Sequence, residues 1–203
     1  MPYSKFRKIT EVAKKFKLQV ASGIFFPTEI RKIQPSIYLT ESLNMSKSIG
    51  YANEKERSER LVAPILNQLA AQNNHQITIY SGRDLDVDST NDLNGECDFL
   101  LGLGKLLMSE VMRPLFSIVE AKEQDLRYGL AQCAAQLYGT KLFNEQEGLI
   151  LPKYYGASTT GDVWCFLKLE NNKLTIDETK YFLTDLELLL GRLQFLVDDV
   201  QQD

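Results

Sequence analysis

The stretch Leu115-Phe-Ser-Ile-Val-Glu-Ala-Lys122 decides how the rest of the sequence is interpreted. It carries apolar residues at both odd and even positions, which is typical of a central strand buried on both faces of a sheet. Two charged residues, Glu120 and Lys122, nevertheless end the run. Because side chains alternate along a strand, these two point to the same face and lie roughly 6–7 Å apart.

A third unexpected charge, Asp98, lies 22 residues before Glu120 in the strand-like run Glu96–Leu103. Burying a carboxylate or an ammonium costs on the order of several kcal/mol per ion unless something compensates. One explanation is a Glu–Lys ion pair at the end of a strand. The other is a metal site, with Asp98 and Glu120 as ligands from neighbouring strands and Lys122 beside an attacking water. Carboxylate oxygens suit Mg²⁺ or Mn²⁺.

The remaining sequence predicts helices and strands in alternation around these two runs. A helix is expected over residues 53–72, with Asn53 as its N-cap and a kink or break at Pro64. Two more helices are expected, over residues 125–143 and after Thr184. The other expected strands are Gln76–Tyr80, Gly148–Gly156, Val163–Leu169 and Leu174–Phe182. This order predicts an α/β fold (α+β in a strict classification), with a central mixed β-sheet flanked by helices on both faces.

The composition excludes several kinds of site. The chain has 203 residues, 44% of them hydrophobic, as expected for one globular domain. Zinc sites with several histidines are excluded because the chain has a single histidine, His75. This histidine lies in a polar run that indicates a loop. The three cysteines are too widely spaced for a CxxC zinc site, and their odd number argues against a disulfide framework. With no apolar run long enough for a membrane span and no signal-peptide pattern, a cytoplasmic location is expected.

The net charge of −4 is unevenly distributed. Residues 1–35 carry eight basic and two acidic residues, a balance of +6. This asymmetry indicates either a polyanion partner or a first helix with a solvated lysine face. Residues 1–50 are expected to form a basic helical extension packed on the core, with an irregular stretch from about Pro27. Residues 51–203 are expected to form the main domain.

Three motifs carry a resemblance to a known family. They are Gly95-Glu-Cys-Asp98, Ile118-Val-Glu-Ala-Lys122, and a following helix that contains Gly129-Leu-Ala-Gln132. Their order resembles the PD-(D/E)XK nuclease superfamily, which has the restriction-endonuclease-like fold. The likeness covers about residues 50–182, and it is closest to small bacterial members and to the nuclease part of type I restriction subunits. Cys97 stands where the family pattern has a proline.

The resemblance implies Mg²⁺- or Mn²⁺-dependent hydrolysis of phosphodiester bonds in DNA, with an RNA or nucleotide hydrolase that uses the same metal centre as an alternative. Asp98, Glu120, the carbonyl of Ala121 and a glutamate of the first core helix would hold the metal. By its spacing, Glu54 best matches that glutamate, with Glu56 and Glu59 as alternatives. Lys122 would orient the attacking water or stabilise the oxyanion, and Gln132 would face the active site. The implied catalytic residues are Asp98, Glu120, Lys122, Glu54 and Gln132.

A second interpretation is a catalytically inactive relative that acts as a binding or regulatory module. A pI near 5.2 weakens the case for tight nucleic-acid binding, because affinity comes largely from basic residues that neutralise phosphates. If the charged residues are only structural, Glu54 should point to solvent and the chain should bind no divalent ion. Expected partners of an active enzyme are DNA, a second copy of the chain in a homodimer, and a protein that supplies specificity, but no membrane.

Overall fold

The computed structural model describes residues 2–105, 114–122 and 125–201. Its centre is an open, mixed eight-stranded sheet in the order β1-β7-β6-β5-β4-β3-β2, with β8 paired to β6. The β4–β5 and β1–β7 pairs are parallel and the other pairs are antiparallel. The strands are β1 (Gln19–Ser22), β2 (Ile77–Asp84), β3 (Glu96–Leu103), β4 (Leu115–Ala121), β5 (Lys153–Thr159), β6 (Val163–Glu170), β7 (Lys173–Ile176) and β8 (Tyr181–Phe182).

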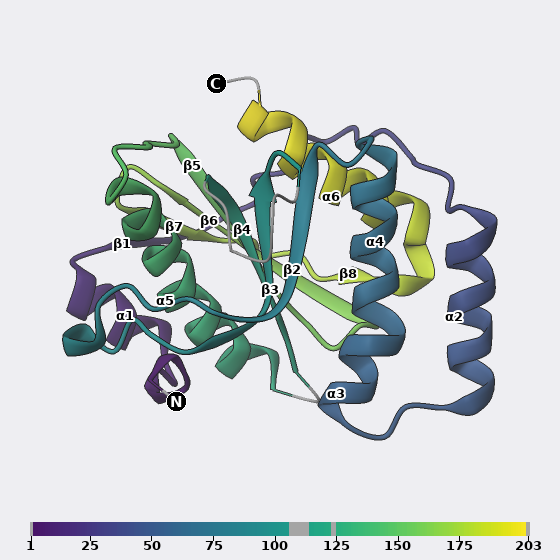
Figure 1. Ribbon diagram of the computed structural model, residues 1–203, viewed down its shortest axis with the longest axis horizontal. Coiled ribbons are helices and arrows are strands. Elements are labelled where there is room, and N and C mark those ends of the chain that lie inside the picture. Colours follow the sequence, from purple (N-terminus) through teal and green to yellow (C-terminus); the bar gives the residue numbers. More distant parts are fainter. Residues whose placement is uncertain (1, 106–113, 123–124, 202–203) are drawn as a thin grey trace.

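Helices cover both faces of this sheet, as Figure 1 shows. One face packs against α1 (Ile9–Phe16) and α5 (Leu126–Glu145). The other packs against α4 (Ala63–Gln72) and α6 (Leu186–Gln201), with α2 (Ile37–Ile49) outside α4. The predicted α/β class, with a mixed sheet between helical layers, is therefore confirmed.

The central strand β4 serves both cores, as its sequence predicted. All seven of its residues are buried. A β-bulge opposite Leu101 and Gly102 interrupts the simple alternation, so that Phe116 and Ile118 lie in different cores despite their even spacing. Beyond the bulge, the alternation directs Ile118 and Glu120 towards α5.

The first core helix begins where its sequence predicted, and its regular α-helical pattern is interrupted near Pro64. The Asn53 side chain accepts a hydrogen bond from the backbone N–H of Glu56, which makes it the N-cap of α3 (Glu54–Arg57). A π-helical turn, Ser58–Val62, then joins α3 to α4 just before Pro64. Pro64 has no N–H to donate to the carbonyl of Arg60, and the hydroxyl of Ser46 on α2 lies 2.9 Å from that oxygen.

The structure corrects several predicted elements. Residues 37–49, expected to be irregular, form α2, with Ser36 as its N-cap. The outer face of α2 carries apolar side chains, which obscures the amphipathic pattern of a surface helix: Ile37, Tyr38, Met45 and Ile49 are all exposed. Strand β2 continues through Ser81 and Gly82 to Asp84, β5 begins at Lys153 rather than Gly148, and the run 174–182 is divided between β7 and β8.

The first fifty residues contribute a strand to the sheet as well as helices. Strand β1 pairs in parallel with β7 and forms an edge of the sheet. The chain then crosses the N-terminal part of α6, where the backbone N–H of Ile33 donates to the carbonyl of Glu187. Gly191 of α6 faces this crossing, and a Cβ atom there would lie 2.1 Å from the carbonyl oxygen of Arg31.

No helix among the described residues is both long and apolar enough to cross a membrane.

We expect Gly191→Ala to lower the free energy of unfolding by about 1–3 kcal/mol, because a methyl group cannot fit against the backbone of the crossing segment. Urea denaturation measures this change. Gly23→Ala is the matched control, since a Cβ atom at Gly23 meets nothing within 4 Å. Equal stability of Gly191→Ala and wild type would contradict the close packing of this segment on α6.

Candidate functional site

Four of the predicted site residues meet at the end of β4. The Nζ atom of Lys122 lies 2.7 Å from Oε1 of Glu120 and 3.4 Å from Oε1 of Glu54. Asp98, on the neighbouring strand β3, accepts a 2.7 Å hydrogen bond from the backbone N–H of Ala121. A carboxylate from α3, a carboxylate from β3 and the charged end of β4 thus form one cluster.

The parallel strand β5 holds the end of β4 in place. The backbone N–H of Lys122 donates to the carbonyl of Thr159 over 2.7 Å, and Glu120 pairs in register with Ser158. Gly129 of α5 lies against the same point, where a Cβ atom would come within 2.2 Å of Oγ of Ser158 and 2.8 Å of Cγ of Lys122. The absence of a side chain at Gly129 therefore lets the aliphatic part of Lys122 pass between the sheet and α5.

A glutamine of α5 completes the surroundings of Glu120. Nε2 of Gln136 donates a 2.9 Å hydrogen bond to Oε2 of Glu120, so each oxygen of this carboxylate has a partner. Gln132, the glutamine expected to face the site, lies one turn earlier on α5 and is buried. The spacing of the two glutamines was visible in the sequence, but only the packing of α5 on β4 shows which of them contacts Glu120.

Burial and mutual repulsion shape the charges of the cluster. Glu120 is 2% exposed, and burial together with the nearby carboxylate of Asp98 raises its pKa to about 7. Burial also raises the pKa of Asp98, although Lys122 and the N–H of Ala121 oppose the shift. Burial alone would lower the pKa of Lys122, but the surrounding carboxylates outweigh it and raise that pKa. Three carboxylates around one ammonium leave a local excess of negative charge.

The cluster borders a pocket of about 440 Å³. Asp98 and Glu54 line it together with Ser81 and Gly82 of β2. The rest of the lining consists of two further acids, Glu59 and Glu96, together with Lys55 and Ser58. Solvent thus reaches Asp98 and Glu54 from this side, while Glu120 lies behind them in the protein interior.

Of the three glutamates on the first core helix, Glu54 alone contacts Lys122 among the described residues. The carboxylate of Glu56 instead accepts a hydrogen bond from the backbone N–H of Ala52. Glu59 lines the pocket and lies 3.9 Å from Lys55. Glu54 therefore both contacts Lys122 and faces solvent, because its side chain is 45% exposed.

An arginine clamp fixes α3 over the site. Nη1 of Arg57, three residues after Glu54, donates to the carbonyl of Thr160 and to Oδ2 of Asp162. Its guanidinium also lies 4.7 Å from the centre of the Tyr51 ring. Because Thr160 and Asp162 follow directly on β5, the clamp ties α3 to the strand that positions Lys122.

The donor chemistry of the cluster suits a hard divalent cation. The available oxygens belong to Asp98, Glu120, Glu54 and the carbonyl of Ala121, and the excess negative charge favours a cation. In the described part of the chain, however, no three His, Cys, Asp or Glu side chains are already grouped as metal ligands. The ammonium of Lys122 lies between Glu120 and Glu54, so both carboxylates would have to turn away from it to bind one ion.

Two residues that sequence reasoning did not select lie beside the cluster. The hydroxyl of Ser158 is buried and finds no hydrogen-bond partner among the described residues, and Oε1 of Gln136 is in the same situation. No sequence signal marks Ser158, because its proximity to Glu120 follows from the β4–β5 register.

The sequence matches no family model and none of the curated proteins with which it was compared.

We expect the free energy of unfolding to fall as the pH rises from about 4.5 to about 7. In this window the unfolded chain has released the Glu120 proton, at its usual pKa of 4.5, while the folded protein still holds it at a pKa of about 7. The unfolded state therefore binds fewer protons, so raising the pH favours unfolding.

Glu120→Gln, which stays neutral, should lessen this decrease, whereas Glu29→Gln at an exposed position should not. Urea denaturation between pH 4 and 8 in the presence of EDTA measures it. The remaining slope should include Asp98, whose pKa is shifted in the same direction. The same slope in Glu120→Gln and wild type would show that Glu120 is not the group that holds the proton.

Proposed function

We propose that this chain is a metal-dependent nuclease that hydrolyses phosphodiester bonds of DNA with Mg²⁺ or Mn²⁺. The observation that carries the proposal is the contact between Glu54 and Lys122 beside Asp98 and Glu120. It brings together a carboxylate from a distant helix and the charged ends of two strands at the edge of an open pocket. The same proposal includes a restriction-endonuclease-like fold for the sheet and its helices.

The residues of the cluster have separate roles in this proposal. Asp98, Glu120, Glu54 and the carbonyl of Ala121 would hold the ion. A bound divalent ion lowers the pKa of a water ligand and neutralises charge on the phosphate. Lys122 has three N–H donors, and its raised pKa keeps it protonated, so it can donate to the attacking water or to a phosphate oxygen. Burial around Glu120 strengthens these electrostatic interactions.

Two neighbours keep these groups in position. Gln136 donates to Glu120 and fixes the orientation of its carboxylate. The hydrogen bonds of Arg57 hold α3, and with it Glu54, against the turn that follows β5. Gln132, buried one turn before Gln136, stays a candidate for contact with the substrate or with the ion's waters.

One observation favours the second candidate, a binding or regulatory module without catalysis. Both oxygens of Glu120 already have partners inside the protein, from Lys122 and Gln136. A satisfied, buried Glu–Lys pair needs no metal to be stable. In that case the pocket beside Asp98 would bind no divalent ion.

Calorimetric titration with Mg²⁺ or Mn²⁺, combined with plasmid nicking in the same buffers, separates the two candidates. We expect the wild type to bind the ion and nick DNA. Asp98→Ala should abolish ion binding, and Asp98→Ala, Glu120→Gln and Lys122→Met should each lower the nicking rate by about 100-fold or more. Asp185→Ala is the matched control, because Asp185 is exposed in the turn before α6.

The outcomes discriminate clearly. Loss of both binding and nicking in Asp98→Ala, but not in Asp185→Ala, supports the nuclease. A wild type that binds neither ion would sink the catalytic proposal and favour the binding module. Nicking that survives in Asp98→Ala would assign the activity to a contaminant or to another part of the chain.

The proposal extends to the setting in which the enzyme works. A cytoplasmic location, a homodimer that supplies two sites for the two strands of a duplex, and a protein partner that supplies specificity all belong to it. Sedimentation would show the dimer directly, and a monomer at micromolar concentration would count against it.

A further inference from the structure

The side chain of Tyr128 contacts the N-terminal segment, which includes Ser4 and Arg7, and also lies near Lys122 of the candidate site. The hydroxyl of Tyr128, in the first turn of α5, donates a 2.6 Å hydrogen bond to the carbonyl of Ser4. The guanidinium carbon of Arg7 lies 5.7 Å from the centre of the Tyr128 ring, and Nζ of Lys122 lies 6.0 Å from the same centre. The cationic groups of Arg7 and Lys122 are therefore within about 12 Å of each other.

The N-terminal segment is held firmly in this position. The Tyr3 side chain is buried against Gly139 in the middle of α5, and its hydroxyl donates to the carbonyl of Leu85. The backbone N–H groups of Arg7 and Lys8 donate to the carboxylate of Glu11, at the start of α1. The main chain at Arg7 is thus fixed, while its side chain is exposed.

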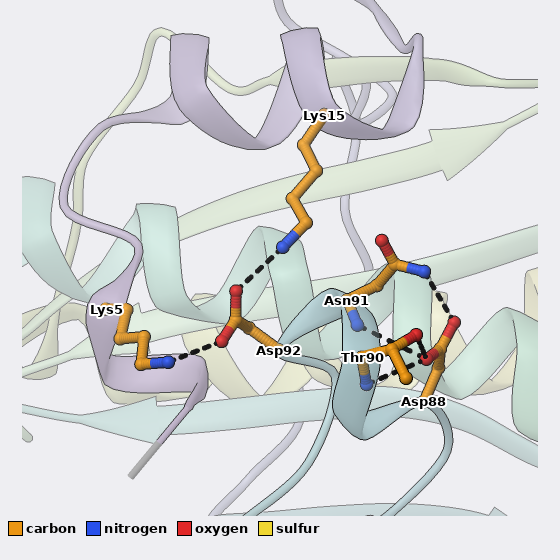
Figure 2. A network of polar contacts seen from close by, with 6 residues as sticks. All are labelled: Lys5, Lys15, Asp88, Thr90, Asn91 and Asp92. Atoms are coloured by element: carbon orange, nitrogen blue, oxygen red, sulfur yellow. Dashed lines mark hydrogen bonds and ion pairs between the residues drawn. The ribbon is translucent and has the colours of Figure 1, made fainter.

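The basic residues of this segment are not equivalent. Figure 2 shows that Lys5 and Lys15 both contact Asp92, at 2.6 and 2.7 Å. These bonds lower the pKa of Asp92 to about 2, so this acid stays charged and neutralises part of the cationic charge around it. Among the described residues, the guanidinium of Arg7 is paired with no carboxylate and lies over the ring of Tyr128. Of these three cations, Arg7 is therefore the one that no described carboxylate neutralises, so its guanidinium is available to an external anion.

We propose that Arg7 is a substrate-binding residue whose guanidinium holds a backbone phosphate next to the one that reacts at Lys122. The inference rests on the proposed function, which identifies the anion as a phosphodiester. An arginine fork can donate two parallel hydrogen bonds to phosphate oxygens, and a cation stacked on a ring keeps its edge N–H groups available.

The charge distribution around the site explains why Arg7 would matter for DNA binding. The pocket beside Asp98 is lined by four acids and one lysine, and the whole chain carries a net charge of −4. A polyanion would be repelled from this pocket unless a cation beside it attracted the backbone. Arg7 lies on the α5 side of Lys122, and Glu54 contacts Lys122 from α3. The nucleic acid would thus approach over Tyr128 and meet the acids only at the reacting phosphate.

Fluorescence anisotropy with labelled single-stranded and duplex DNA, in EDTA and at several salt concentrations, tests the proposal. Arg7→Gln should lower the affinity by roughly fivefold to tenfold at 0.1 M salt, and it should reduce the slope of log K against log salt by about 0.7–0.9, the value for one lost phosphate contact. Lys14→Gln is the matched control, because it removes the same charge from an exposed position in the same segment. It should change the affinity less than twofold.

The two proposals, the role of Arg7 and the nuclease activity, can be distinguished by combining binding with nicking. Equal effects of Arg7→Gln and Lys14→Gln, or no effect of either, would overturn the role of Arg7, and so would a wild type that binds no DNA. If the wild type nicks plasmid DNA and Arg7→Gln does so with unchanged KM, the nuclease stands and the Arg7 contact is wrong. If Arg7 governs DNA binding while no metal-dependent nicking occurs, the binding surface stands and catalysis is wrong.

Discussion

The burial of Glu120 and Lys122 at the end of β4 is the constraint on which the rest of the site depends. Glu120 is almost fully excluded from solvent, and leaving either ion unpaired there would cost several kcal/mol by the usual estimate. The fold meets this requirement with hydrogen bonds from Gln136 and Lys122 to the two carboxylate oxygens. It also needs Gly129, because any side chain there would collide with the stem of Lys122.

The same constraint links elements that are far apart in the chain. The β4–β5 register sets the main chain of Lys122, the turn after β5 holds Arg57, and Arg57 places α3 so that Glu54 reaches Lys122. Burial, together with the nearby carboxylate of Asp98, raises the pKa of Glu120, although Lys122 and Gln136 oppose the shift. Perturbed pKa values of this kind occur at functional sites and in structural ion-pair networks alike.

Acidic and basic residues are concentrated in different parts of the molecule. Acids gather at the pocket, where a cation would neutralise them, and basic residues gather in the N-terminal segment. The structure separates those basic residues by their partners. Asp92 pairs with Lys5 and Lys15, whereas Arg7 lies over the ring of Tyr128, whose centre is 6.0 Å from Nζ of Lys122. An overall negative charge is therefore compatible with local attraction of a phosphate backbone.

The amino-acid sequence by itself determined the class of fold and the central position of β4, and it predicted the grouping of Asp98, Glu120 and Lys122. It left open which of Glu54, Glu56 and Glu59 joins them, and the structure shows the contact from Glu54. Doubly apolar strands, charges at strand ends and the Asn53 cap are local signals, and local signals survive in a linear pattern. It did not show α2, whose exposed face is apolar, or the role of β1 as an edge strand. Only the tertiary structure decided that Gln136 contacts Glu120, that Ser158 lies beside it, and that Arg7 and Lys122 both lie near the ring of Tyr128. The physical reason is that these contacts depend on strand register and on the rotation of a helix about its axis, and both are set by packing between residues distant in the chain.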